Sequence, residues 1–76
     1  MIIDDGSHIQ DHMIKSFMIL WKMIKPNGLY IIEDIDILFF DRIKDLPNEL
    51  QLLDALCILT YKGQFECDNF IVFMKT

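Results

Sequence analysis

The order of apolar and polar positions predicts a strand, a helix and a second strand in the first half of the chain. Residues 1–4 form an apolar run that ends in acid before Asp5-Gly6-Ser7, which predicts a short buried strand leading into a tight turn. In residues 9–25, apolar positions recur every three or four residues, which predicts a helix with one apolar face. That face carries Met13, Phe17, Leu20, Trp21 and Ile24. Residues 29–32 are apolar without interruption, as is typical of parallel strands covered on both faces.

The second half of the chain predicts a further helical region and two more strands. Residues 37–56 favour helix with an interruption near Pro47, because proline lacks the N–H that an interior helical turn needs. Residues 57–61 and 70–75 are strand candidates separated by a polar stretch. We therefore predict an α/β fold in which a parallel βαβ unit is followed by a helix and two strands. Ligands of such sheets bind beyond the carboxyl ends of the strands.

The composition is unusually apolar for so short a chain. The 76 residues allow one domain at most, yet 53% of them are hydrophobic, with six Phe and five Met. One small core cannot easily cover that much apolar surface. We therefore expect these residues to belong to a larger core or to bury surface against a partner.

Charge and cysteine content exclude several classes of protein. The net charge is −5 and the basic residues form no cluster, so nucleic-acid binding is not expected. Cys57 and Cys67 have no nearby histidine pair for zinc and are too few for a disulfide framework, so reduced thiols are expected. No apolar run is long enough to span a membrane, and no signal peptide follows Met1. These features together predict a cytoplasmic protein.

Acidic residues close both predicted strands of the βαβ unit, as Asp4-Asp5 and as Glu33-Asp34. Neighbouring parallel strands lie about 4.8 Å apart, so we expect the two acidic pairs to face each other at one rim of the sheet. Two like charges 4–5 Å apart repel by roughly 3–4 kcal/mol at an effective dielectric of 20. A bound cation, a shared proton or a nearby lysine could offset that repulsion, and an all-oxygen site suits Mg²⁺, Ca²⁺ or Mn²⁺. The alternative is that these acids are turn and helix-cap residues.

Two histidines lie close to this rim in the sequence. His8 directly follows the turn and could accept a proton from a metal-bound hydroxyl near neutral pH. The alternative for His8 is a partly exposed helix-capping residue. His12 follows one helical turn later, so the two could clamp a metal, although the nearby acids make a hard-cation site the more natural interpretation.

The first half of the chain resembles the S-adenosylmethionine-dependent sugar O-methyltransferases of the macrocin and mycinamicin type. The cephalosporin hydroxylase and rhamnosyl O-methyltransferase group shares the pattern. The resemblance covers residues 1–36, whereas residues 37–76 match only in element order, as a terminal helix and an antiparallel strand pair. The motifs are Ile2-Ile3-Asp4-Asp5-Gly6-Ser7-His8, His12, Ser16-Phe17, Lys25-Pro26-Asn27-Gly28 and Leu29-Tyr30-Ile31-Ile32-Glu33-Asp34.

The resemblance implies the C-terminal half of a Rossmann-like class I methyltransferase fold. It assigns Asp5, Glu33 and Asp34 to a Mg²⁺ site and His8 to the general base that deprotonates a sugar hydroxyl. A divalent ion would lower the pKa of a coordinated hydroxyl, and the resulting alkoxide would attack the methyl group of S-adenosylmethionine in line. The implied partner is therefore a sugar or another small molecule that offers a hydroxyl group.

The chain also departs from that family's pattern. Its three glycines form no glycine-rich loop of the kind that holds the cofactor, and residues 35–40 keep little of the family's sequence. We therefore expect residues 1–76 to be one partial methyltransferase-like domain that lacks the cofactor-binding half and does not bind S-adenosylmethionine alone. The alternative is a non-catalytic module that pairs its open sheet edge with a companion chain or with itself. A hydroxylase-type relative is disfavoured because no iron-binding His-carboxylate triad stands out.

Overall fold

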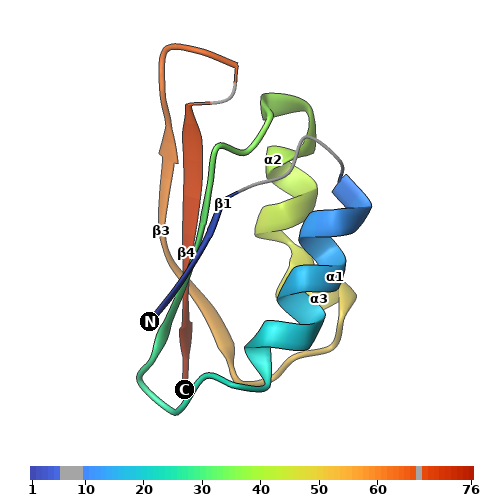
Figure 1. Cartoon of the computed structure of the whole chain (residues 1–76), viewed down its shortest axis with the longest axis vertical. Coiled ribbons are helices and arrows are strands. Elements are labelled where there is room, and N and C mark those ends of the chain that lie inside the picture. Colours follow the sequence, from blue (N-terminus) through green and yellow to red (C-terminus); the bar gives the residue numbers. More distant parts are fainter. Residues whose placement is uncertain (6–9, 67) are drawn as a thin grey trace.

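The computed structural model describes residues 1–5, 10–66 and 68–76, which fold as one layer of helices against a four-stranded sheet (Figure 1). The strands are β1 (Ile2–Asp5), β2 (Leu29–Glu33), β3 (Ala55–Lys62) and β4 (Asn69–Lys75). The helices are α1 (Gln10–Trp21), α2 (Ile37–Lys44) and α3 (Leu46–Glu49). None of the helices in these ranges has the length and apolar character needed to cross a membrane.

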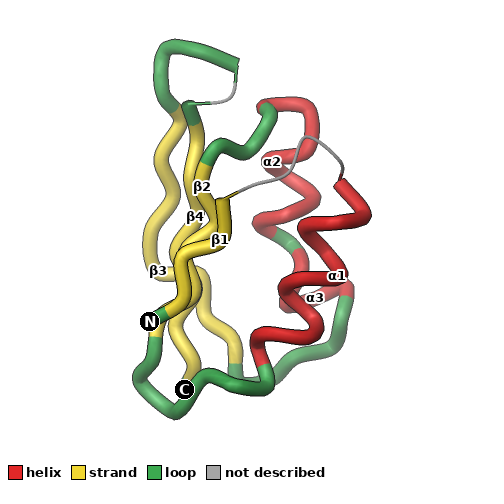
Figure 2. The backbone as a smooth tube through the Cα atoms, in the orientation of Figure 1, coloured by secondary structure: helices red, strands yellow, loops and turns green. Residues whose placement is uncertain are grey.

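The sheet has the strand order β1-β2-β4-β3 (Figure 2). β1 and β2 are parallel and joined through α1, whereas β4 is antiparallel to both of its neighbours. The predicted parallel βαβ unit and the following strand pair are therefore confirmed as parts of a mixed α/β sheet. The carboxyl ends of the parallel strands β1 and β2 lie together at one end of the sheet, opposite the chain termini (Figure 1), and we call this end the acidic edge.

The core lies between the sheet and α1, because the apolar face of α1 packs on alternate residues of β2 and β4. Met13, Phe17 and Trp21 are buried, as the helical spacing predicts. The ring of Phe17 stacks on that of Trp21 and meets the rings of Tyr30 and Phe73 edge-on, with centroid distances of 5.1 to 5.2 Å. Such aromatic pairs add stability beyond the area that they bury.

α1 ends at Trp21, four residues before the predicted end of the helix. The N–H groups of Met23 and Ile24 bond to carbonyls only three residues earlier, so the chain tightens into turns there. Nζ of Lys75 donates a hydrogen bond to the carbonyl oxygen of Trp21 at 3.1 Å. A cation is favourable at this end of a helix because unpaired carbonyls make it partly negative.

The predicted helical region 37–56 is broken into two helices and ends early. Asp36 caps α2 by accepting a hydrogen bond from the N–H of Leu38, and the helix stops at Lys44. Pro47 lies in the first turn of α3, where its missing N–H costs no hydrogen bond, so the predicted break is confirmed. The prediction of helix up to residue 56 was wrong, because β3 begins at Ala55 and pairs with β4.

The sheet is covered by the described helices on one face alone (Figure 2). Tyr30 and Ile32 are fully buried on that side, whereas Ile3 and Leu59 on the other side are each 53% exposed. The apolar run 29–32 was predicted to be covered on both faces, and for the described residues that prediction was wrong. The apolar side chains of the uncovered side, which we call the open face, are Ile3, Leu29, Ile31, Leu56, Leu59, Tyr61, Phe70, Val72 and Met74.

Candidate functional site

Two of the predicted metal ligands are brought together by the parallel strands. Asp5 and Glu33 are the last residues of β1 and β2, and their Cα atoms are register partners. Side chains alternate along a strand, so Asp5 shares the open face with Ile3, and Glu33 shares it with Ile31. The two carboxylates therefore stand side by side on one face, at the edge where ligands of such sheets bind.

The third predicted ligand, Asp34, directly follows β2 and turns the chain. Its φ of 53° is in the left-handed region, which aspartate tolerates better than most residues. Its side chain is exposed, while the next residue, Ile35, is fully buried. Asn69 holds Ile35 in place through hydrogen bonds in both directions, so the backbone directly after Asp34 is fixed.

Asp4 does not belong with the other three carboxylates. It lies on the helix side of the sheet, where its Oδ2 accepts a hydrogen bond of 2.7 Å from the hydroxyl of Tyr30. The prediction that all four acids face one another was therefore wrong. The two-residue period of a strand sends Asp4 and Asp5 to opposite faces, so one of the pair always points away from Glu33.

Tyr30, the hydrogen-bond partner of Asp4, is a residue of this region that the sequence did not single out. It is 0% exposed, and burial raises the pKa of its hydroxyl far above the ordinary value, with further contributions from the hydrogen bond to Asp4 and from the Asp4 charge. Tyr30 therefore stays a hydrogen-bond donor throughout the neutral pH range. A tyrosine inside an otherwise aliphatic run was the available signal, because a buried hydroxyl needs a partner.

The predicted general base, His8, lies outside the described residues, as do Gly6 and Ser7. Its role therefore stays a prediction. His12 is described and lies exposed on α1.

The carboxylates at this edge fit a divalent cation in their chemistry. Asp5, Glu33 and Asp34 offer only oxygen donors, which Mg²⁺ and Mn²⁺ prefer, and the register sets the first two side by side. Within residues 1–5, 10–66 and 68–76, no three histidine, cysteine, aspartate or glutamate side chains gather closely enough to hold an ion. The strands thus set Asp5 beside Glu33, whereas Asp34 does not complete a three-ligand cluster with this pair in the structure.

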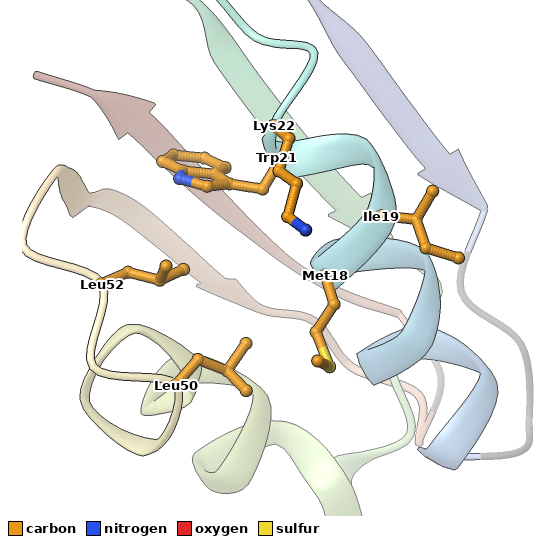
Figure 3. A pocket seen from close by; sticks show the side chains of 6 residues that line it. All are labelled: Met18, Ile19, Trp21, Lys22, Leu50 and Leu52. Carbon is orange, nitrogen blue, oxygen red and sulfur yellow. The ribbon is translucent and has the colours of Figure 1, made fainter.

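A pocket of about 240 Å³ lies between α1 and the segment that follows α3, away from the acidic edge (Figure 3). Its walls are almost entirely apolar, with one lysine. The residues that line it are Met18, Ile19, Trp21, Lys22, Leu50 and Leu52. Lys22 is the one ionisable side chain among these lining residues, with no carboxylate, histidine or cysteine beside it, so the pocket is not the candidate catalytic site.

Comparison with known proteins identifies relatives over part of the chain. It is 51% identical to demethylmacrocin O-methyltransferase of Streptomyces fradiae and 51% identical to mycinamicin VI 2''-O-methyltransferase of Micromonospora griseorubida, each over 35 residues. A tetracenomycin-C 2'-O-methyltransferase of Streptomyces olivaceus, which acts on an 8-demethyl-8-alpha-L-rhamnosyl substrate, is 46% identical over the same length. Almost half of this chain is similar to O-methyltransferases. The resemblance to the macrocin and mycinamicin type is thus confirmed.

The matched stretch covers 46% of this chain but 9% of each of those relatives. No protein-family profile matches the chain, and no solved structure does.

Proposed function

We propose that these 76 residues form part of a divalent-cation-dependent sugar O-methyltransferase. In this proposal Asp5, Glu33 and Asp34 hold Mg²⁺, and His8 is the general base. The register that sets Asp5 beside Glu33 at the carboxyl ends of two parallel strands supports it most directly. The similarity to O-methyltransferases over 35 residues supports the same conclusion independently.

The proposed chemistry is the transfer of a methyl group to a sugar hydroxyl. A divalent cation at the acidic edge would lower the pKa of a hydroxyl bound to it. His8 would accept the hydroxyl proton, and the alkoxide oxygen would form a bond to the methyl carbon of S-adenosylmethionine as the carbon–sulfur bond breaks. The methyl group leaves the sulfonium as its positive charge is neutralised, so the step needs no other reactant.

We further propose that the fold is the C-terminal half of a Rossmann-like class I methyltransferase. The insertion of β4 between β2 and β3, antiparallel to both, agrees with the antiparallel strand pair expected for that half. S-adenosylmethionine would then be bound by residues outside these 76. Gly28 and Gly63 support this, because the N–H of each closes a local turn rather than facing a ligand.

The metal site can be tested by titrating Mn²⁺ into the wild-type chain and the variant Asp5→Ala/Glu33→Ala. We expect a weak site that the double substitution abolishes. Asp41→Ala/Glu49→Ala is the matched control, because it removes the same charge from exposed positions in α2 and α3. Equal affinity in the wild type and Asp5→Ala/Glu33→Ala would remove the metal site.

A second function, a non-catalytic interaction module, is favoured by a different observation. β1 forms one end of the sheet, so its outer backbone groups are unpaired within the described residues, and the open face beside it is apolar. Natural proteins usually protect such edges with charge, proline or a covering element. In this alternative, the chain pairs with a companion chain or with itself through β1.

A further inference from the structure

Tyr30 and Asp4 connect the two parallel strands on the helix side of the sheet, directly behind the candidate metal ligands. Tyr30 is the register partner of Ile2, yet its hydroxyl reaches Asp4, two residues further along β1. Diagonal contacts of this kind are within the reach of aromatic side chains. The hydrogen bond therefore ties β1 to β2 lengthwise, in addition to the backbone bonds that run across.

The ring of Tyr30 is itself held by α1. Phe17 meets it edge-on with centroids 5.1 Å apart, closer than the tilted ring of Trp21 at 6.4 Å. Tyr30 has no exposed surface, so its hydroxyl has little freedom to move. A hydrogen bond of 2.7 Å to a carboxylate is also among the stronger kinds, because the acceptor is charged.

The register of β1 decides where Asp5 points. β1 has four residues and is paired on one side alone in the described structure, so its backbone bonds to β2 are few. A slip of one residue would turn Asp5 to the helix side and remove it from Glu33, because side chains alternate along a strand. A slip would also break the contact between Tyr30 and Asp4, so this contact opposes it.

We propose that Tyr30 is a positioning residue for the divalent-cation site. Through its hydrogen bond to Asp4 it holds the carboxyl end of β1 in the register that sets Asp5 beside Glu33. The inference rests on the proposed metal-binding function. The side chains of Tyr30 and Asp4 lie on the helix side of the sheet, and neither residue is a metal ligand in this proposal.

The test compares Tyr30→Phe with Trp21→Phe in the 76-residue chain. Tyr30→Phe removes only the hydroxyl, and we expect it to weaken Mn²⁺ binding roughly tenfold, as loss of a residue that orients a ligand does. Trp21→Phe keeps an aromatic ring at that position and removes only the hydrogen bond from Nε1 to Oδ1 of Asp54, which lies away from the acidic edge. We expect both variants to lower the melting temperature, because each loses a hydrogen bond. Trp21→Phe should nevertheless leave Mn²⁺ affinity close to that of the wild type.

A metal-free measurement separates this inference from the proposed function. In nuclear magnetic resonance spectra, backbone cross-peaks between Asp5 and Glu33 should be present in the wild type and Trp21→Phe and lost in Tyr30→Phe. Retained cross-peaks and unchanged Mn²⁺ affinity in Tyr30→Phe would overturn the positioning role. An equal loss of Mn²⁺ affinity in Tyr30→Phe and Trp21→Phe would also overturn the positioning role, because the affinity would then depend only on the overall stability of the fold. If Asp5→Ala/Glu33→Ala binds Mn²⁺ as the wild type does, the metal function fails, and the cross-peaks still decide the role of Tyr30.

Discussion

Asn69 and Ile35, 34 positions apart in the sequence, hold each other through two hydrogen bonds. The N–H of Ile35 donates to the backbone oxygen of Asn69 at 3.1 Å, and Nδ2 of Asn69 donates to the backbone oxygen of Ile35 at 2.7 Å. The same amide donates to the backbone oxygen of Glu66 and accepts from the N–H of Gly63. One buried side chain thus joins the hairpin between β3 and β4 to the segment that follows Asp34.

We therefore expect Asn69→Ala to lower the free energy of unfolding by about 2–3 kcal/mol, because it leaves buried carbonyl groups without donors. Urea denaturation would measure this. Asn48→Ala is the matched control, since the Asn48 amide bonds to Asp45 at an exposed site and its loss should cost about 0.5 kcal/mol or less. Equal losses in the two variants would contradict the structural role of Asn69.

Stability at high pH should depend on Tyr30. The pKa of its hydroxyl is raised in the folded state, above the ordinary value near 10, chiefly by burial and then by the hydrogen bond to Asp4 and the Asp4 charge. Below pH 10 the group is protonated in both states, so its contribution to stability is complete. Above pH 10 the unfolded chain loses the proton while the folded chain keeps it, which lowers stability by about 1.4 kcal/mol per pH unit.

The measurement is the difference in unfolding free energy between the wild type and Tyr30→Phe, from urea denaturation between pH 7 and 11. We expect this difference to be constant up to about pH 9 and to shrink above pH 10. Tyr61 is present in both proteins and therefore does not enter the difference. A difference that stays flat to pH 11 would show that Tyr30 titrates alike in both states.

The sequence predicted the elements better than it predicted what surrounds them. The spacing of Met13, Phe17 and Trp21 defines one helical face, and that face is buried as expected. The run from Leu29 to Ile32 did not reveal that one side of its strand is uncovered by the described residues. An apolar run indicates that a face avoids water, but it does not say whether the same chain supplies the cover.

The sequence also predicted only part of the candidate site. The acids that end two consecutive parallel strands must meet at one edge, so Asp5 and Glu33 were placed together correctly. The separation of Asp4 followed from the two-residue period of a strand and could have been foreseen. The bond from Tyr30 to Asp4 depends on the relative register of two strands, which local patterns do not determine.

The 76 residues should not bind S-adenosylmethionine on their own at micromolar concentration. Dinucleotide-type and phosphate-type sites rely on free N–H groups of a glycine-rich loop before a helix. Here the N–H of Gly28 donates to the carbonyl of Lys25 at 2.8 Å, and that of Gly63 donates to the carbonyl of Asp68 at 2.8 Å. Isothermal titration calorimetry, with and without Mn²⁺, should detect no complex. A tight one-to-one complex would overturn the proposal that residues outside these 76 bind S-adenosylmethionine.

The 76-residue chain should associate in solution rather than remain a stable monomer. The open face exposes Ile3 on β1 and Leu56 and Leu59 on β3 by half or more of their surface, and the outer edge of β1 is unpaired within the described residues. Burying apolar side chains of this size is worth roughly 1.5–3 kcal/mol each when exposure is removed completely. Size-exclusion chromatography with light scattering at micromolar concentration should therefore report a mass well above the 9.0 kDa of one chain.

Leu59→Lys and Leu53→Lys form the matched pair that locates the contact. Leu59 is 53% exposed on the open face, in the outermost strand β3, where it is the register partner of Val72, whereas Leu53 is 100% exposed in the segment before β3. A lysine ammonium on the open face would have to be desolvated in any complex that covers it, which opposes association. We expect Leu59→Lys to shift the chain toward a monomer and Leu53→Lys to leave its mass unchanged. A wild-type chain that elutes as a monodisperse 9.0 kDa monomer and unfolds cooperatively would contradict the prediction. Equal shifts in the two variants would instead place the contact outside the open face.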